Sequence, residues 1–184
     1  TLFSTDDTKK NEDFSEKTIA ELVRACFEMG KVKTGALIVI ERGTPLGEIE
    51  RTGIEVDGIV TSQLLINIFE HNTPLHDGAV VIRGNRVTAA TCYLPLSDNM
   101  DISKALGTRH RAAVGVSEAT DSVTLVVSEE TGRVSVAVSG RLKSVKDGDE
   151  LRDILSVLVK RETENTGRFR IWKGRRRNER KADE

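Results

Sequence analysis

The sequence predicts an α/β fold, with a single mixed β-sheet flanked by helices on both sides. Short apolar runs, of which Ala36–Ile40 is the clearest, are typical of buried strands. Segments with helical spacing of apolar residues alternate with these runs. Two hairpin signals, at Gly84-Asn85 and at Thr131-Gly132, exclude a purely parallel sheet.

The first third of the chain predicts two helices around a strand. Asp13 and Glu16 have the spacing of a capping box, so the first helix is expected to start there and to stop at Gly30. Glycines and a proline predict a loop over residues 41–53. Thr61 or Ser62 then caps a short apolar helix.

The remaining strands are expected in two hairpins, over residues 79–82 and 86–94 and over residues 122–128 and 133–138. Between the hairpins, residues 102–116 are predicted to be mostly helical, with an interruption at Gly107. Asp147 or Asp149 is expected to cap a final amphipathic helix that carries Leu151, Ile154, Leu155, Leu158 and Val159.

Composition excludes several classes of protein. With 184 residues, 38% hydrophobic and 31% charged, the chain is expected to form one globular domain. The net charge of −1 predicts no nucleic-acid partner. The two cysteines lack CxxC spacing, which argues against a zinc site and a disulfide framework. No apolar run approaches the ~20 residues of a membrane span.

The two ends of the chain are expected to be mobile, over residues 1–14 and residues 161–184. The C-terminal segment is basic, and Phe169 and Trp172 interleave with its charges between Arg168 and Lys181. Such a segment is most often a solvated tail, and the alternative is binding to a lipid surface or to nucleic acid. The chain begins with Thr1, which is compatible with a piece of a longer protein.

A first candidate site lies at His76-Asp77-Gly78-Ala79, directly before an apolar strand. Asp77 offers a hard carboxylate that suits Mg²⁺ or Mn²⁺, and it could also polarise a ribose hydroxyl. An isolated Asp-Gly pair is more often a simple turn. His76 is either a packed imidazole or a second metal ligand.

A second candidate site is Gly107-Thr108-Arg109-His110-Arg111. If a helix starts at Thr108, its free N–H groups and its dipole form an anion site, to which the two arginines add charge-assisted hydrogen bonds. The alternative is an ordinary helix start with solvated arginines. The small apolar residues that follow indicate a buried helix, on which arginines need partners.

Two further segments are ambiguous when each is taken alone. Ser128 and Glu130 belong to a polar cluster at a strand end, which is either a hairpin turn or part of a site. Tyr93 and Leu94 end a predicted strand, where an aromatic ring could flank a base and a place in the core is the more common role.

Four blocks in this order, PLHDGAVVI, CYLPLS, GTRHRAAVGVSEATDS and VSEETG, resemble the signatures of diadenylate cyclase (DAC) domains. The resemblance covers roughly residues 15–160 and is closest to the membrane-anchored bacterial type called CdaA or DacA. It implies a metal-dependent enzyme that condenses two ATP into cyclic di-AMP and two pyrophosphates.

The resemblance also implies the roles of individual residues. Asp77, Arg109 and His110 match catalytic positions, and Asp77 and His76 match positions for the Mg²⁺ or Mn²⁺ ion. ATP would be bound by residues from all four blocks, namely Gly78, Ala79, Tyr93, Leu94, Gly107, Thr108, Arg109, His110, Arg111, Ser128 and Glu130.

Because each domain holds one ATP, catalysis is expected to need a face-to-face homodimer or a higher oligomer. The resemblance further implies a membrane anchor outside this sequence, with the domain at the cytosolic face. It also implies a membrane-linked regulator and a phosphoglucosamine mutase as partners. The competing hypothesis is a catalytically silent domain that binds ATP or a cyclic dinucleotide, and an intact Asp77 argues against it.

Overall fold

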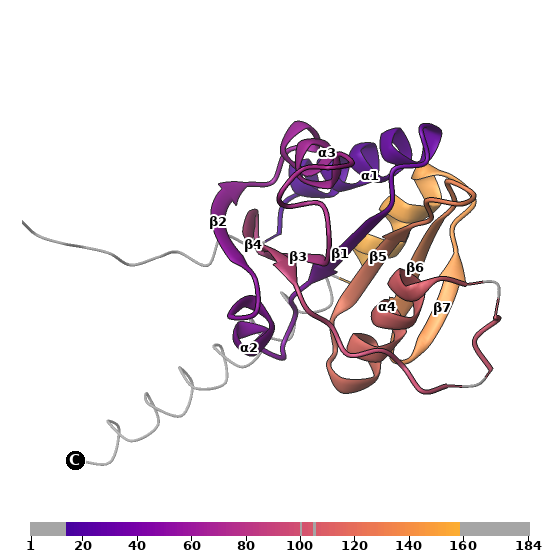
Figure 1. Cartoon of the computed structure of the whole chain (residues 1–184). Helices are drawn as coiled ribbons and strands as arrows, with labels where there is room; N and C mark the ends of the chain where they lie inside the picture. The colour runs from indigo at the N-terminus through magenta and orange to yellow at the C-terminus, as the bar shows by residue number, and fades with distance from the viewer. Residues whose placement is uncertain (1–13, 100, 105, 159–184) are drawn as a thin grey trace, which may run out of the picture.

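The computed structural model describes residues 14–99, 101–104 and 106–158. Its centre is one seven-stranded sheet in the order β2-β4-β3-β1-β5-β6-β7 (Figure 1). The strands are β1 Ala36–Ile40, β2 Ile54–Ile59, β3 Ala79–Arg83, β4 Arg86–Cys92, β5 Val123–Val127, β6 Val134–Val138 and β7 Arg141–Ser144. Because β1 pairs in parallel with β3 and antiparallel with β5, the sheet is mixed, as predicted.

Helices cover both faces of the sheet (Figure 1). They are α1 Glu16–Lys31, α2 Gly47–Glu50, α3 Ser62–Phe69, α4 Thr108–Ala119 and a last helix over residues 148–158. Alternate side chains of β1 divide the core. Ile38 packs in a cluster with residues of α1, α3 and the last helix, and Val39 packs in a second cluster with residues of α4. The prediction of helices on both sides is confirmed.

Side-chain caps fix three of the helix starts. The hydroxyl oxygen of Ser15 accepts a hydrogen bond from the N–H of Thr18 at 3.1 Å, so Ser15 caps α1. The predicted cap of that helix, Asp13, lies outside the described residues. Thr61 caps α3 through the N–H of Leu64, at 3.1 Å, and a carboxylate oxygen of Asp147 accepts from the N–H of Glu150 at 2.9 Å.

The structure corrects the predictions in five places. Helix α2 forms inside the predicted loop, and strands β2 and β7 were not predicted at all. Helix α4 begins at Thr108, and the described residues between 102 and 107 are not helical. Strand β4 ends at Cys92 rather than at residue 94.

Both missed strands are the edges of the sheet, with largely exposed side chains. An edge strand needs no continuous apolar run, so its sequence carries a weak signal. Of the two segments predicted to be mobile, residues 1–13 and 161–184 lie outside the described residues, whereas Phe14 is described and packs against the core. Among the described residues, no helix combines the length and the apolar character that crossing a membrane requires.

Candidate functional site

The register of the sheet brings distant segments together at one end of its central strands, the end at which β1 and β3 begin. This end is called the edge of the site below. Ile38 of β1 lies opposite Val80 of the parallel strand β3, so both strands start at the same edge. Ala36 lies opposite Val127, which places the end of β5 there. Ala79 lies opposite Cys92, which adds the end of β4. Four predicted site segments thus meet at this edge: residues 76–79, residues 93–94, residues 128–130 and, through the contacts of Arg109 described below, the start of α4.

Gly78 is held against the end of β4 in a conformation that suits only glycine. Its φ is +87°, and a Cβ at this position would lie 2.9 Å from the carbonyl oxygen of Cys92 and 2.9 Å from the carbonyl carbon of Thr91. The N–H of Gly78 donates to Oδ1 of Asp77 at 3.0 Å. This turn presents the Asp77 carboxylate at the surface, at the entrance of β3.

The ring of His76 is oriented by the backbone. Its Nδ1 lies 2.7 Å from the carbonyl oxygen of Thr73. Because a carbonyl oxygen only accepts, Nδ1 carries the proton of this hydrogen bond, and Nε2 of the neutral ring is left with a lone pair. The ring of His71 packs edge-on against it, with 5.6 Å between the centroids. A backbone carbonyl on the second nitrogen is the arrangement commonly found behind a metal-binding histidine.

Arg109 reaches across the start of β1. Its Nη1 lies 3.0 Å from Oε1 of Glu129, in the turn after β5. A Cβ added to Gly35 would lie 2.9 Å from Cζ of Arg109, so the guanidinium rests on that glycine. Gly35 and Glu129 therefore contact a predicted site residue, and the sequence did not indicate either of them. Glu129 lies inside the VSEETG block, where only Ser128 and Glu130 drew attention, and Gly35 directly precedes an obvious strand.

The start of α4 has the features of an anion site. Its N-cap is Gly107, which provides no side-chain hydrogen bond to the first turn, and Thr108 is exposed. His110 is only 5% exposed. Burial lowers the pKa of His110 below its ordinary value, with Arg109 acting in the same direction and Glu129 acting against it. The imidazole is therefore neutral at neutral pH, and positive charge comes from the arginines.

In each of the two remaining segments, residues 128–130 and 93–94, one residue is buried and another is exposed. Ser128 is 6% exposed, and its hydroxyl oxygen accepts from the N–H groups of Glu130 at 3.3 Å and of Thr131 at 3.2 Å. This turn presents the Glu130 side chain to solvent. Leu94 is 4% exposed and Tyr93 is 71% exposed, so Leu94 anchors a segment that offers an aromatic ring.

Ala79 and Arg111 make backbone hydrogen bonds, in the sheet and to the loop before α4 respectively. Ala79 is buried in the sheet, which leaves only its backbone for a ligand. Arg111 is half-buried, and its carbonyl accepts from the N–H of Ser97 at 3.0 Å. A cavity of about 520 Å³ lies between residues 95–99 and the C-terminal half of α4, and it is lined by none of the predicted residues. Within the described ranges, no three His, Cys, Asp or Glu side chains gather closely enough to hold a metal ion.

Known proteins share both the sequence and the fold. The family model described as DisA bacterial checkpoint controller nucleotide-binding, or DAC, matches residues 23–142. The cyclic di-AMP synthase CdaA of Bacillus subtilis is 50% identical over 166 residues, which are 90% of this chain and 61% of that protein. A diadenylate cyclase of Listeria monocytogenes is 51% identical over 157 residues, which are 85% of this chain and 58% of that protein.

A crystal structure of a double mutant of DacA from Staphylococcus aureus is similar in fold to this chain. Its TM-score is 0.75 at 48% sequence identity, over 77% of this chain and 94% of that chain. The chain spans about three fifths of the length of the two curated relatives. The family match and these identities together show that the chain belongs to the DAC family of nucleotide-binding domains.

Proposed function

We propose that the chain is the catalytic domain of a diadenylate cyclase, which condenses two ATP into cyclic di-AMP and two pyrophosphates. The observation that carries this proposal is the meeting of Asp77, the start of α4 and the Ser128 turn at one edge of the sheet. Relatives named cyclic di-AMP synthase and diadenylate cyclase support it at 50% and 51% identity.

In this reaction the 3′-hydroxyl oxygen of one ATP attacks the α-phosphorus of the other. A new P–O bond forms, the bond to pyrophosphate breaks, and the hydroxyl proton leaves. The exposed carboxylate of Asp77 suits the activation of that hydroxyl. Arg109 and the free N–H groups of the first turn of α4 suit the negative charge of the phosphates. His110, neutral and beside Arg109, would donate a hydrogen bond rather than a charge.

A divalent cation, Mg²⁺ or Mn²⁺, fits the donors at the entrance of β3. Asp77 provides a hard oxygen, and His76 has its Nδ1 fixed by Thr73 so that Nε2 is left as a donor. Such ions are usually held by one or two protein carboxylates together with substrate phosphates, so two ligands from the chain are sufficient. A bound ion would neutralise charge on the phosphates and lower the pKa of the attacking hydroxyl.

The base and the second ATP complete the proposal. Tyr93 would flank the adenine and the backbone of Leu94 would read it. Ser128 and Glu130 would lie near the phosphates and the metal. One chain offers one half-site, so the nucleophile must come from a second copy that faces it about a two-fold axis.

The family resemblance extends the proposal to the cell. The full-length protein is expected at the cytosolic face of the membrane, with a membrane-linked regulator and a phosphoglucosamine mutase as partners. Fractionation of cells that express the full-length protein tests the location. Affinity purification from the same membranes tests the two partners.

The reaction itself is tested by incubating the domain with ATP and Mg²⁺ or Mn²⁺ and analysing the products by mass spectrometry. We expect cyclic di-AMP and pyrophosphate in a ratio of one to two. Binding of ATP with no product at high enzyme concentration would contradict the proposal and favour a silent nucleotide-binding domain.

A further inference from the structure

The backbone of Tyr93 is held by one side chain from another segment. Tyr93 follows the end of β4 and its ring is largely exposed, so packing of the ring does not fix its position. Its N–H donates to the hydroxyl oxygen of Thr52 at 2.8 Å. The same hydroxyl donates to the carbonyl oxygen of Ile49 at 2.6 Å. Thr52 thereby ties the predicted base-flanking residue to helix α2.

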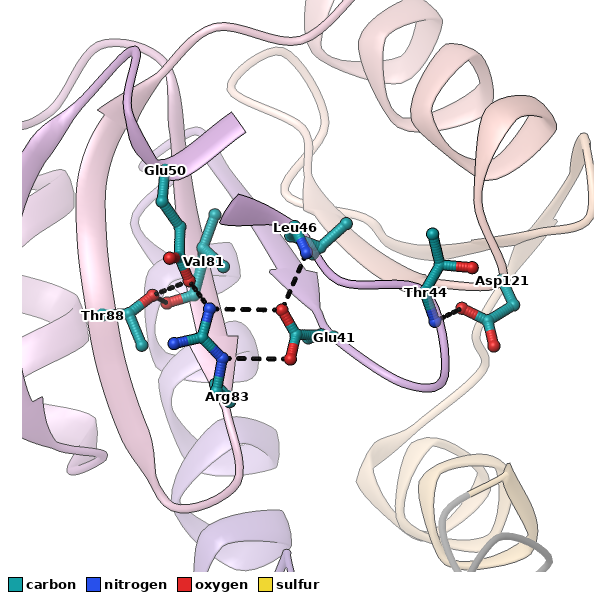
Figure 2. A network of polar contacts seen from close by, with 8 residues as sticks. All are labelled: Glu41, Thr44, Leu46, Glu50, Val81, Arg83, Thr88 and Asp121. Atoms are coloured by element: carbon teal, nitrogen blue, oxygen red, sulfur yellow. Dashed lines mark hydrogen bonds and ion pairs between the residues drawn. The ribbon is translucent and has the colours of Figure 1, made fainter. Parts of the chain in front are cut away.

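Helix α2 is short and is held in place by a network of charges (Figure 2). Oε1 of Glu50 accepts from Nη2 of Arg83 at 2.5 Å and from the hydroxyl of Thr88 at 2.8 Å. Nε of Arg83 lies 3.0 Å from Oε1 of Glu41. Because the Glu41 and Glu50 side chains are only 13% and 19% exposed, this network is more than a pair of solvated surface ions.

The network and the site lie at opposite ends of the central strands. Glu41 follows the end of β1 and Arg83 ends β3, whereas the site gathers at the starts of those strands. The chain from Glu41 to Gly53 runs back toward the site. It is pressed onto the end of β4 at Gly53, where a Cβ would lie 2.3 Å from the carbonyl oxygen of Ala90. The position of Thr52 is therefore fixed by α2 before it and by the contact of Gly53 with β4 after it.

We propose that Thr52 is a positioning residue for base recognition, and that the Glu41–Arg83–Glu50 network holds it in place. Because the N–H of Tyr93 is bound to Thr52, that N–H is not available to the base, which leaves the Tyr93 ring and the backbone of Leu94 as the predicted contacts. Thr52 sets where that ring and that backbone lie. The inference rests on the proposed function and adds to it a residue outside the four signature blocks.

The first test compares Thr52→Val with Thr52→Ser. Valine keeps the shape and removes both hydrogen bonds, whereas serine keeps the hydroxyl. We expect Thr52→Val to raise the KM for ATP about three- to tenfold, the effect of one or two lost hydrogen bonds, with little change in kcat. Thr52→Ser should restore the wild-type KM. A merely structural role would lower the active fraction, and hence kcat, and would leave KM unchanged.

The second test uses two glutamates of the same helix. Glu50→Gln weakens the network and should raise KM in the same direction as Thr52→Val. Glu48→Gln is the matched control, because Glu48 pairs with Arg51 on the exposed side of α2 and should leave KM unchanged. Equal KM values for Thr52→Val, Glu50→Gln and the wild type would overturn the inference.

Calorimetric titration with an ATP analogue that has a methylene group in place of the α,β-bridging oxygen, and so cannot release pyrophosphate, separates this inference from the proposed function. If the wild type makes no cyclic di-AMP, the proposed function fails, and the dissociation constants still test the role of Thr52. Weaker analogue binding by Thr52→Val, restored by Thr52→Ser, would support the inference. Identical binding by all three proteins would refute it.

Discussion

Asp77 shows what the sequence and the structure each indicate about a single residue. From the sequence, Asp77-Gly78 is either a turn or a site, because turn chemistry and metal chemistry use the same residues. In the structure it forms a turn that is compatible with the proposed site. The positive φ of Gly78 forms the turn, and the turn leaves the Asp77 carboxylate exposed at the sheet edge. Sequence reasoning alone could not decide, because the decision depends on which segments lie alongside.

Replacing the Asp77 carboxylate tests its role in the chemistry. Asp77→Asn should lower kcat by at least about a hundredfold, because general-base assistance and metal binding each contribute on that scale. The affinity for an ATP analogue should change far less, since in the proposed site Arg109 and the start of α4 would still bind the phosphates. Steady-state kinetics and calorimetry check this, with Asp98→Asn, an exposed aspartate by the separate cavity, as the control. Equal losses of turnover and of binding would make Asp77 a binding residue.

Gly78 is predicted to be intolerant of any side chain. Gly78→Ala places a Cβ 2.9 Å from two backbone atoms at a φ of +87°, so the free energy of unfolding should fall by roughly 1–3 kcal/mol. Gly47→Ala is the control, because no atom lies within 4 Å of a Cβ at that position. Urea denaturation measures both variants. A Gly78→Ala protein as stable as Gly47→Ala would show that the turn relaxes freely.

At the level of elements, the central strands could be predicted from the sequence, and the two edge strands β2 and β7 could not. β1 is buried on both faces, so its five residues are all apolar and the run is unmistakable. β2 contains Asp57 at a positive φ and Gly58, at an irregularity in its pairing with β4, and both residues are typical of turns. β7 has only four residues, mostly exposed. Their strand identity comes from the neighbours that they pair with, which no local pattern records.

The connection after β1 depends on a carboxylate at the start of β5. Asp121 accepts a hydrogen bond from the N–H of Thr44 at 2.8 Å (Figure 2). It also accepts one from the N–H of Gly43 at 2.9 Å. Burial acts to raise the pKa of Asp121, but these N–H groups and nearby Arg42 outweigh it, so its pKa lies below the ordinary value. The ionised form therefore stabilises the fold. This contribution is present above the ordinary pKa of an aspartate and is lost as the pH falls through the lower pKa of the folded state.

Asp121→Ala should accordingly lower the free energy of unfolding by about 1–2 kcal/mol at neutral pH, the scale of hydrogen bonds to an exposed charged acceptor. The difference from the wild type should shrink below about pH 4, where the unfolded aspartate is protonated. Denaturation curves at several pH values measure it. Asp98→Ala again provides a solvent-exposed comparison. A difference that stays constant down to pH 2 would rule out the charge as its source.

For the whole molecule, the residues that gather at this end of the sheet were easier to predict from the sequence than the contacts between them. The four sequence blocks contain most of the residues that meet at this end of the sheet, among them Asp77, Tyr93, Arg109 and Ser128. The ion pair of Arg109 with Glu129 and the support of Tyr93 by Thr52 were missed, because each joins segments that become neighbours only through the sheet. Thr52 and Tyr93 are 41 positions apart, and neither is unusual in its local sequence.

The proposed half-site on each chain would make the reaction depend on assembly, and this leads to the last prediction. Activity per domain should rise with protein concentration below the dissociation constant of the dimer and level off above it, because only a facing pair supplies both nucleophile and acceptor.

Adding excess Asp77→Asn protein to a fixed amount of wild type should yield mixed dimers. These can form one phosphodiester bond and not the second, so the linear, singly joined product should accumulate. Mass spectrometry detects that product, and light scattering reports the oligomer. Constant specific activity from a protein that remains monomeric throughout would contradict catalysis between two facing chains.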